Sequence, residues 1–113
     1  MSRADTLADL EARVSDNPVM LFMKGSAEDP RCGFSTAALD LLRRVGQPFG
    51  TWDVLDDPEY RYVLCEHTGC PSVPQVFVGG RFVGDGDRLH ELFASGELQR
   101  LVEAASAKGP AAE

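Results

Sequence analysis

Residues 19–45 read VMLFMKGSAEDPRCGFSTAALDLLRRV, and this stretch joins three different patterns. Its first five letters form a continuous apolar run after Pro18, which is typical of a strand buried on both faces. After a polar loop, apolar residues recur with helical period from Gly33 until Gly46, where glycine favours a helix end. The stretch therefore predicts a strand, a loop and a helix, with Cys32 directly before the helix.

Cys32 stands where thiol chemistry is expected. Unpaired backbone N–H groups and the dipole of a helix start stabilise a thiolate, so the pKa of Cys32 is expected to lie below that of a free cysteine. Lys24 and Arg31 would add positive charge if they face the sulfur. Cys32 is therefore a candidate nucleophile or metal ligand, while a small apolar residue in a crowded turn is the plainer alternative. Ser35 occupies the position where many thiol proteins carry a second cysteine.

The remaining patterns predict a mixed α/β domain. They comprise a helix over 6–14 capped by Asp5 or Thr6, a strand over 49–54, a helix from Asp57-Pro58 toward His67, a hairpin over 75–84 that turns at Gly79-Gly80, and closing helices over 87–93 and 96–105. The signals are helix caps, a proline in a first turn and a two-glycine turn. This order predicts a small sheet, parallel at first and antiparallel at the hairpin, with helices on both faces.

Length and charge narrow the function classes. A chain of 113 residues is expected to form one domain, taken as 1–107, followed by a flexible tail at 108–113. The net charge of −7 offers no basic surplus for binding nucleic acid or an anionic membrane surface. The absence of a signal-peptide pattern and of an apolar run of about eighteen residues predicts no membrane span. Three cysteines at irregular spacing favour a reducing compartment, and we expect a cytoplasmic protein.

Two shorter motifs add candidate binding groups. The Val73-Pro74 step precedes the hairpin, and a cis bond there would leave the backbone of Val73 free to pair with an extended peptide. An ordinary trans proline at the start of an edge strand is the alternative. Gly84 to Asp87 precede a helix whose free N–H groups can hold a carboxylate, and a simple aspartate cap is the alternative there.

Taken in order, these pieces resemble the monothiol glutaredoxins of the CGFS class, within the thioredoxin-like fold. The matching blocks are Phe22-Met23-Lys24-Gly25, Pro30-Arg31-Cys32-Gly33-Phe34-Ser35, Asp56-Asp57-Pro58-Glu59 with Arg61, Pro71-Ser72-Val73-Pro74-Gln75, Phe82-Val83-Gly84, Asp87 and Gly96-Glu97-Leu98. They stay in register over nearly the whole chain. The resemblance implies a four-stranded mixed sheet with flanking helices and a cis Val73-Pro74 bond.

The resemblance also implies a glutathione site around Cys32. It would combine two cations for the glycine carboxylate, a free strand edge for the amides and a helix start for the γ-glutamyl end. By position, these are Lys24 and Arg61, then Val73 with Pro74, and then Gly86 with Asp87. Glutathione is a short acidic peptide, so this division of roles makes physical sense.

Proteins of this class typically hold a 2Fe-2S cluster between two protomers, each of which supplies one protein cysteine and one glutathione thiol. Here the cysteine would be Cys32, in a homodimer bridged by the cluster. Ser35 removes the thiol that would otherwise close a disulfide with Cys32. The implied function is storage and transfer of iron-sulfur clusters to apoproteins, and a part in iron homeostasis, often with BolA-like partners.

The sequence departs from the family in two motifs. Cys70 stands where the family usually has tryptophan, and Asp85-Gly86 stand where it usually has glycine and a second cysteine. Asp85 is expected to weaken glutathione binding by repulsion unless it points away. Cys70 becomes a candidate resolving thiol for Cys32, since the loop before the cis proline is expected to lie near the active-site turn.

Three other functions stay open. The first is a glutathione-dependent oxidoreductase of low activity that removes glutathione from mixed disulfides through Cys32 alone. In the family, a longer loop such as Ser26 to Arg31 accompanies poor reductase activity, which favours the cluster carrier. The second is a zinc site, whose ligands would be Cys65, His67, Cys70 and Cys32. The third is a thioredoxin-like module without redox or metal function.

Overall fold

The computed structural model describes residues 2–108. Its elements follow in the order α1 (Arg3–Asp16), β1 (Val19–Met23), α2 (Gly33–Val45), β2 (Gly50–Asp53), α3 (Pro58–Thr68), β3 (Gln75–Val78), β4 (Arg81–Asp85), α4 (Gly86–Ser95) and α5 (Glu97–Lys108). Every predicted helix and strand is present, with shifted ends. Residues 109–113 of the expected tail lie outside the described residues. Within residues 2–108, no helix is long and apolar enough to cross a membrane.

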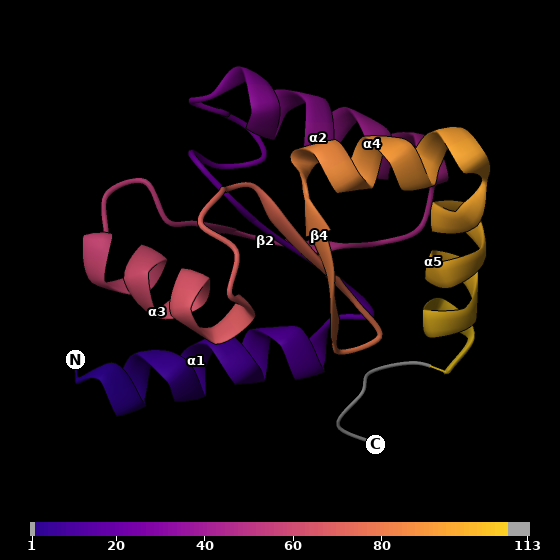
Figure 1. Ribbon diagram of the computed structural model, residues 1–113. Coiled ribbons are helices and arrows are strands. Elements are labelled where there is room, and N and C mark those ends of the chain that lie inside the picture. Colours follow the sequence, from indigo (N-terminus) through magenta and orange to yellow (C-terminus); the bar gives the residue numbers. More distant parts are fainter. Residues whose placement is uncertain (1, 109–113) are drawn as a thin grey trace.

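The strands form one mixed sheet in the order β2-β1-β3-β4, which confirms the predicted sheet (Figure 1). β1 runs parallel to β2, with Met20 opposite Gly50, and antiparallel to β3, with Leu21 opposite Val76. β4 completes the antiparallel half at the sheet edge. The parallel pair is connected through α2, as parallel neighbours require a crossover.

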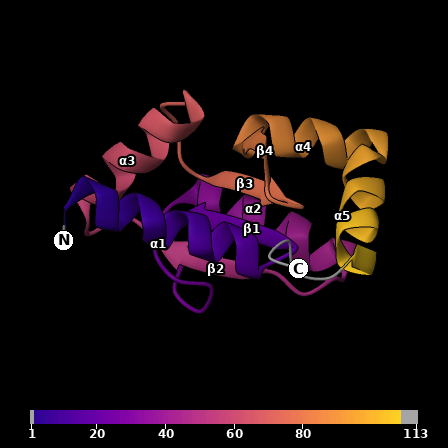
Figure 2. The same cartoon turned by 90° about the horizontal axis from the view of Figure 1, so that it is seen from below.

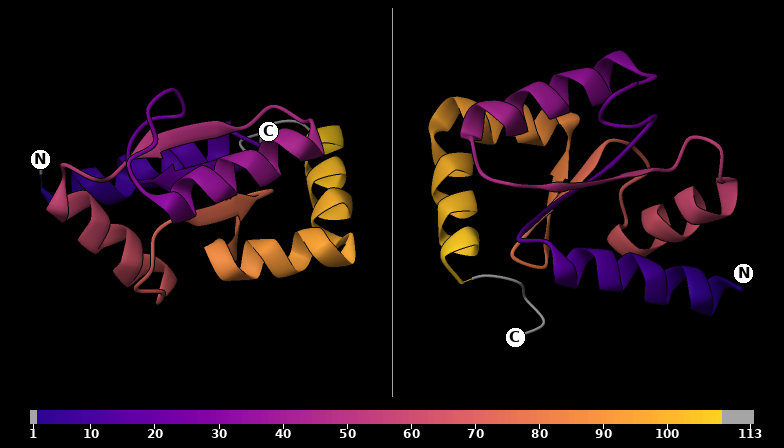
Figure 3. Two further views of the ribbon diagram at one scale, coloured as in Figure 1. Left: turned by 90° about the horizontal axis from the view of Figure 1, so that it is seen from above. Right: turned by 180° about the vertical axis from the view of Figure 1, so that it is seen from behind.

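β1 lies at the centre of the fold because both of its faces are covered. Val19, Leu21 and Met23 join the apolar core formed with α2, α4 and α5. Met20 and Phe22 join the second core, formed with α1 and α3. Figures 2 and 3 show the two helix layers on opposite sides of the sheet, with α5 running across the end of α4. Burial of each such side chain contributes about 1.5–3 kcal/mol, so the apolar run fixes the middle of the sheet.

The predicted hairpin is formed by β3 and β4. Gly79 and Gly80 have φ angles of 61° and 82°, in the left-handed region that residues with a Cβ rarely adopt. A two-residue turn with positive φ at both positions matches the twist of the flanking strands. The hairpin ends directly at α4, so it brings the start of that helix to the edge of the sheet.

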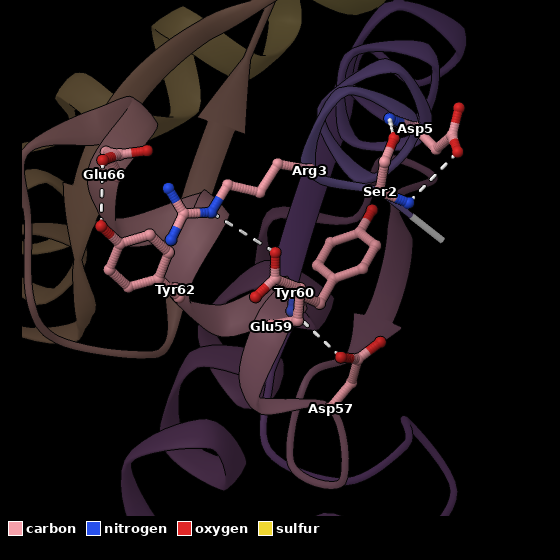
Figure 4. A network of polar contacts seen from close by, with 8 residues as sticks. All are labelled: Ser2, Arg3, Asp5, Asp57, Glu59, Tyr60, Tyr62 and Glu66. Carbon is pink, nitrogen blue, oxygen red and sulfur yellow. Dashed lines mark hydrogen bonds and ion pairs between the residues drawn. The ribbon is translucent and has the colours of Figure 1, made fainter.

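The expected cap of α1 is wrong. The helix begins at Arg3, and Ser2 is its N-cap (Figure 4). The Ser2 hydroxyl accepts a hydrogen bond from Asp5 N at 3.1 Å, and Asp5 Oδ2 accepts one from Ser2 N at 3.2 Å. Asp5 is thus the acidic third residue of a capping box rather than the cap itself. Thr6, the other expected cap, is buried inside the helix layer.

Contacts between α1 and α3 hold α3 in place. Tyr60 is fully buried, and its hydroxyl donates to Asp9 Oδ2 at 2.6 Å. Arg3 pairs with Glu59 at 3.5 Å on the outer surface, where such a pair contributes little (Figure 4). The buried Tyr60 bond is therefore the main polar link between the two helices, and α3 in turn carries Arg61.

Candidate functional site

An open cavity of about 290 Å³ lies where five segments meet: the end of β1, the first turn of α2, α3, the loop before β3 and the start of α4. Its lining residues are Lys24, Phe34, Arg61, Pro71, Ser72, Val73, Pro74, Asp85, Gly86 and Asp87. These residues come from far apart in the sequence. The cavity therefore depends on the sheet bringing β1, the β3 loop and α4 together.

Cys32 is the N-cap residue of α2, with extended backbone at φ −151°. The backbone N–H groups of Ser35 and Phe34 lie close enough to stabilise a thiolate, although the sulfur closes no full capping hydrogen bond. The Ser35 N–H is the main cause that holds the pKa of Cys32 below its ordinary value, and the charge of Lys24 acts in the same direction. The lowered pKa expected for a thiol at this helix start is therefore present, and the role of Cys32 as a nucleophile or ligand stays a prediction.

The turn after β1 carries Lys24 to the cavity. Lys24 N donates to the hydroxyl of Ser35 at 3.0 Å, and Lys24 O accepts from Arg31 N at 2.9 Å. Gly25 has a φ of +90°, and a Cβ there would meet Asp29 O at 2.5 Å, so the return of the loop requires glycine. The backbone of Lys24 is therefore held by residues on both sides of Cys32.

Arg31 does not act as the second cation at the thiol. Its guanidinium pairs with the Asp29 carboxylate at 2.8 Å on the exposed loop. The groups that lower the pKa of Cys32 include Lys24 but not Arg31. Of the two candidate cations, only Lys24 acts on the sulfur, because the Asp29 carboxylate on the loop engages Arg31.

The loop before β3 forms one wall of the cavity. The Val73-Pro74 peptide bond is cis, and both residues are buried while lining the cavity. Pairing of β3 with its neighbours begins at Gln75, so Val73 lies outside the strand ladder. The cavity thus meets a short stretch of backbone that lies outside the strand ladder, just before the sheet begins.

The start of α4 forms the adjoining wall, where a Cβ on Gly86 would lie 3.6 Å from Pro74 Cγ. Asp85 is the N-cap residue, and its Oδ1 accepts a hydrogen bond from Arg88 N at 3.1 Å. Gly86 and Asp87 follow in the first turn, with their backbone N–H groups at the helix start. Lys24 and Arg61 therefore place positive charge on the cavity, whereas Asp85 and Asp87 place negative charge on it.

The structure brings together most of the residues that the sequence indicated. Lys24, Arg61, Val73, Pro74, Gly86 and Asp87 all line the one cavity. Cys32 is not among the lining residues, but Phe34 in the same helix turn is.

Cys70 lies apart from this set and does not line the cavity. Its thiol donates to Ser72 O at 3.8 Å, and Cys32, Cys65 and Cys70 are all free. In residues 2–108, no group of three or more His, Cys, Asp or Glu side chains could hold a metal ion. The zinc set of Cys65, His67, Cys70 and Cys32 is therefore not assembled.

The role of Phe34 in the cavity was missed from the sequence. Its side chain is 67% exposed beside Cys32, although it is a large apolar residue. Ser72 was missed as well and lines the cavity from the loop. The signal for Phe34 was a large apolar residue two positions after Cys32, in a first helix turn whose buried position is taken by Ser35.

Comparison with known proteins agrees with this geometry. A family model described as glutaredoxin matches residues 19–83. The chain is 45% identical over 103 residues to an uncharacterized monothiol glutaredoxin ycf64-like of Synechocystis sp., covering 91% of this chain and 96% of that protein. It is 37% identical to Glutaredoxin 4 of Escherichia coli strain K12, with coverage of 91% and 90%. The solution structure of reduced poplar apo GrxS14 has a TM-score of 0.85 and 34% identity, covering 95% of this chain and 99% of that one.

The fold and the site together define a thioredoxin-like protein that presents one thiol of lowered pKa at a helix start. The family match covers more than half of the chain, and the relatives align along nearly all of it. The chain belongs to the glutaredoxin family, as a monothiol member of the CGFS type with Ser35 in the place of a second thiol.

Proposed function

We propose that this chain binds glutathione in the cavity beside Cys32 and carries a 2Fe-2S cluster shared between two protomers, for storage and transfer to apoproteins. The observation that carries the proposal is the single thiol of lowered pKa next to a cavity lined by Lys24 and Arg61. A thiolate is the form of cysteine that ligates iron, so a lowered pKa favours ligation.

The cavity suits a short acidic peptide that contains a thiol. Lys24 and Arg61 offer charge-assisted hydrogen bonds to the glycine carboxylate of glutathione. The backbone of Val73, outside the strand ladder, pairs with the cysteine residue of the tripeptide. The N–H groups at Gly86 and Asp87 receive the γ-glutamyl carboxylate. This binding mode leaves the glutathione thiol beside Cys32.

The cluster is cargo, and each protomer contributes one sulfur through Cys32 and one through its bound glutathione. The fit depends on Cys32 staying available, which Ser35 ensures because it offers no thiol for a disulfide. The recipients are iron-sulfur apoproteins, BolA-like proteins are the expected partners, and a reducing compartment such as the cytoplasm keeps Cys32 reduced. The proposed role in iron homeostasis follows from this cargo.

Anaerobic reconstitution with iron, sulfide and glutathione tests the proposal. Visible absorption reports the cluster, and solution mass reports the dimer. We expect both signals in the wild-type protein and in a Cys65→Ser control, and neither in a Cys32→Ser variant. Omitting glutathione should abolish both signals as well. A cluster that forms without Cys32 or without glutathione would overturn the proposed ligand set.

A glutathione-dependent oxidoreductase is the second candidate, favoured by the lowered pKa of the same thiol. The Cys32 thiolate attacks the glutathione sulfur of a mixed disulfide, that disulfide bond breaks, and the target leaves as a thiolate. A second glutathione thiolate then attacks the glutathione sulfur of the mixed disulfide on Cys32, that bond breaks, Cys32 is regenerated as a thiolate, and oxidised glutathione is released. Steady turnover of a small mixed disulfide, together with failed cluster reconstitution, would select this function over cluster carriage.

A further inference from the structure

Gln75 is a fully buried polar residue at the first position of β3, directly after the cavity loop. Its side-chain amide donates hydrogen bonds to Cys70 O and to Ser72 O, each at 2.9 Å. The same nitrogen also lies 3.7 Å from Cys65 Sγ on α3, but its two short bonds go to carbonyl groups of the loop that precedes the cis proline. The glutathione contacts proposed for the cavity do not involve this side chain.

The other end of the amide is held by α3. Thr68 Oγ1 lies 2.9 Å from Gln75 Oε1 and 3.2 Å from Leu64 O, and its one hydrogen is directed at the nearer acceptor, Gln75. The same hydroxyl oxygen accepts from Cys70 N at 3.2 Å. Thr68 is the last residue of α3. The loop is thus bound on one side through the carbonyls of Cys70 and Ser72, and on the other through the N–H of Cys70.

This network ends at the cavity wall. Ser72 and Val73 line the cavity, and Val73 is only 7% exposed. The loop contributes no strand pairing at these positions, because the ladder of β3 starts at Gln75. The side-chain amide therefore replaces the backbone ladder as the polar link that holds Ser72, and with it the adjacent Val73.

We propose that Gln75 is a positioning residue for ligand binding, which fixes the Cys70–Val73 loop so that the backbone of Val73 can pair with the bound peptide. This inference rests on the proposed glutathione function. Gln75 does not touch the ligand and acts through the loop carbonyls. Pairing with an extended peptide needs a preformed backbone edge, and ordering the loop only on binding would lower the affinity.

A donor is required at this position, so Gln75→Glu is an informative variant. An ionised carboxylate would accept hydrogen bonds only, and it would face two carbonyl oxygens that need a donor. Burial raises the pKa of such a carboxyl, and its protonated form can again donate one bond. The matched control is Gln99→Glu on the exposed surface of α5, where the Gln99 side chain donates to Glu103.

Glutathione affinity is measured by calorimetry for both variants between about pH 8 and about pH 5, the range in which a buried carboxyl titrates. Relative to Gln99→Glu, the Gln75→Glu variant should bind about tenfold more weakly at high pH and should recover as the pH falls. Thermal unfolding at each pH shows that both variants are folded. An affinity ratio that stays near one, or that does not change with pH, would overturn the proposal.

Two further measurements keep the inference separate from the proposed function. If the wild-type protein binds no glutathione, the proposed function fails, and amide NMR signals of Ser72 and Val73 in the free protein decide on Gln75. Those signals should titrate in Gln75→Glu and not in Gln99→Glu, and equal behaviour would refute the role of Gln75. If Gln75→Glu does not fold, Thr68→Val is compared with Thr51→Val on the edge strand β2.

The Thr68→Val change removes the hydroxyl that donates to Gln75 and accepts from Cys70. It should weaken glutathione binding by about threefold or more and shift the amide signals of Ser72 and Val73, because a looser Gln75 holds the loop less well. Thr51→Val should leave both unchanged. Equal affinities and equal spectra for the two valine variants would contradict the positioning role.

Discussion

The hydroxyl of Ser35 accepts a hydrogen bond from the backbone N–H of Lys24 at 3.0 Å, and this bond ties the turn after β1 to the first turn of α2. Ser35 is fully buried. The residue in the place of a second thiol is thus part of the framework that holds Lys24 and Cys32 together. A lone thiol at this helix start leaves Cys32 open to an external partner, and the serine keeps the turn ordered.

Replacing Ser35 with alanine should lower the free energy of unfolding by about 1–3 kcal/mol, because Lys24 N would lose its partner in a partly buried position. Chemical denaturation measures this change. Ser15→Ala on α1, where the serine side chain is half-buried, is the matched control and should change stability little. Equal stabilities of the two variants would show that water replaces the Ser35 hydroxyl.

The thiol of Cys32 should react with an alkylating reagent with a pH midpoint below the ordinary thiol pKa of 9.0, because backbone N–H groups and Lys24 favour the thiolate. A Cys65→Ser/Cys70→Ser background isolates this thiol. Lys24→Met should move the midpoint upward, whereas Arg44→Met at the end of α2 should not. A midpoint at or above the ordinary value in the background protein would contradict this prediction.

The same shift makes folding stability depend on pH. A folded-state pKa below the unfolded value means that the stabilisation is fully present above 9.0 and is lost as the pH falls through the folded pKa of Cys32. As the pH rises from the folded pKa of Cys32 to about 9.0, the free energy of unfolding should therefore increase relative to that of Cys32→Ser. Parallel stability curves for the two proteins would contradict it.

Asp85→Asn should raise glutathione affinity by about three- to tenfold, since it removes a negative charge at the cavity wall that receives a ligand carboxylate. Asparagine still caps α4, so stability should change by less than about 0.5 kcal/mol. Calorimetry at low and high salt measures the gain, which should shrink as salt screens the charge. Asp40→Asn on the outer face of α2 is the control. A loss of affinity instead would mean that Asp85 binds the amino group of the ligand.

Tyr60→Phe should lower the free energy of unfolding by about 1–2 kcal/mol near neutral pH, because the buried hydroxyl donates to Asp9. That bond is the main cause that lowers the pKa of Asp9. The stabilisation is therefore present above the ordinary carboxyl value of 3.8 and is lost as the pH falls through the folded pKa of Asp9.

The difference between wild type and Tyr60→Phe should accordingly shrink in acid, as followed by denaturation at several pH values. Tyr62→Phe provides the control, because the hydroxyl of Tyr62 donates to Glu66 on the exposed surface. The Tyr62→Phe variant should change the free energy of unfolding little at any pH. If Tyr62→Phe lowered the free energy of unfolding as much as Tyr60→Phe does, burial would not determine how much these hydrogen bonds stabilise the fold.

Several helices, strands and turns could be predicted from short stretches of the sequence alone. The apolar run of β1, the two glycines of the hairpin turn and Asp57-Pro58 at the start of α3 each carry their own physical signal, and all three stand where they were expected. The start of α1 was misplaced because Ser2 and Asp5 cap it reciprocally, and either acceptor alone would look like a cap.

The residues of the candidate site also differ in whether a short stretch of sequence could indicate their role. The helix start at Cys32 indicated a lowered thiol pKa directly, since that effect arises within one turn of its own helix. Lys24 was already a candidate cation because it follows the strand before Cys32, whereas Arg61 was indicated only by the resemblance to glutaredoxins. Arg31 was the other candidate cation, but a neighbouring carboxylate holds it, because sequence distance does not say where a long side chain turns.

The amino-acid order alone thus set the strand, turn and helix signals and the presence of a single thiol before α2, because these depend on neighbours within a few residues. Tertiary structure decided which side chains meet at the cavity, that Asp85 caps α4 beside it, and that the buried amide of Gln75 holds the loop of Ser72. The cavity joins segments that only the packing of helices on a mixed sheet brings together. The hydrogen bonds of Asp85 and Gln75 span three residues each, but the fold sets the backbone path and the burial that form them.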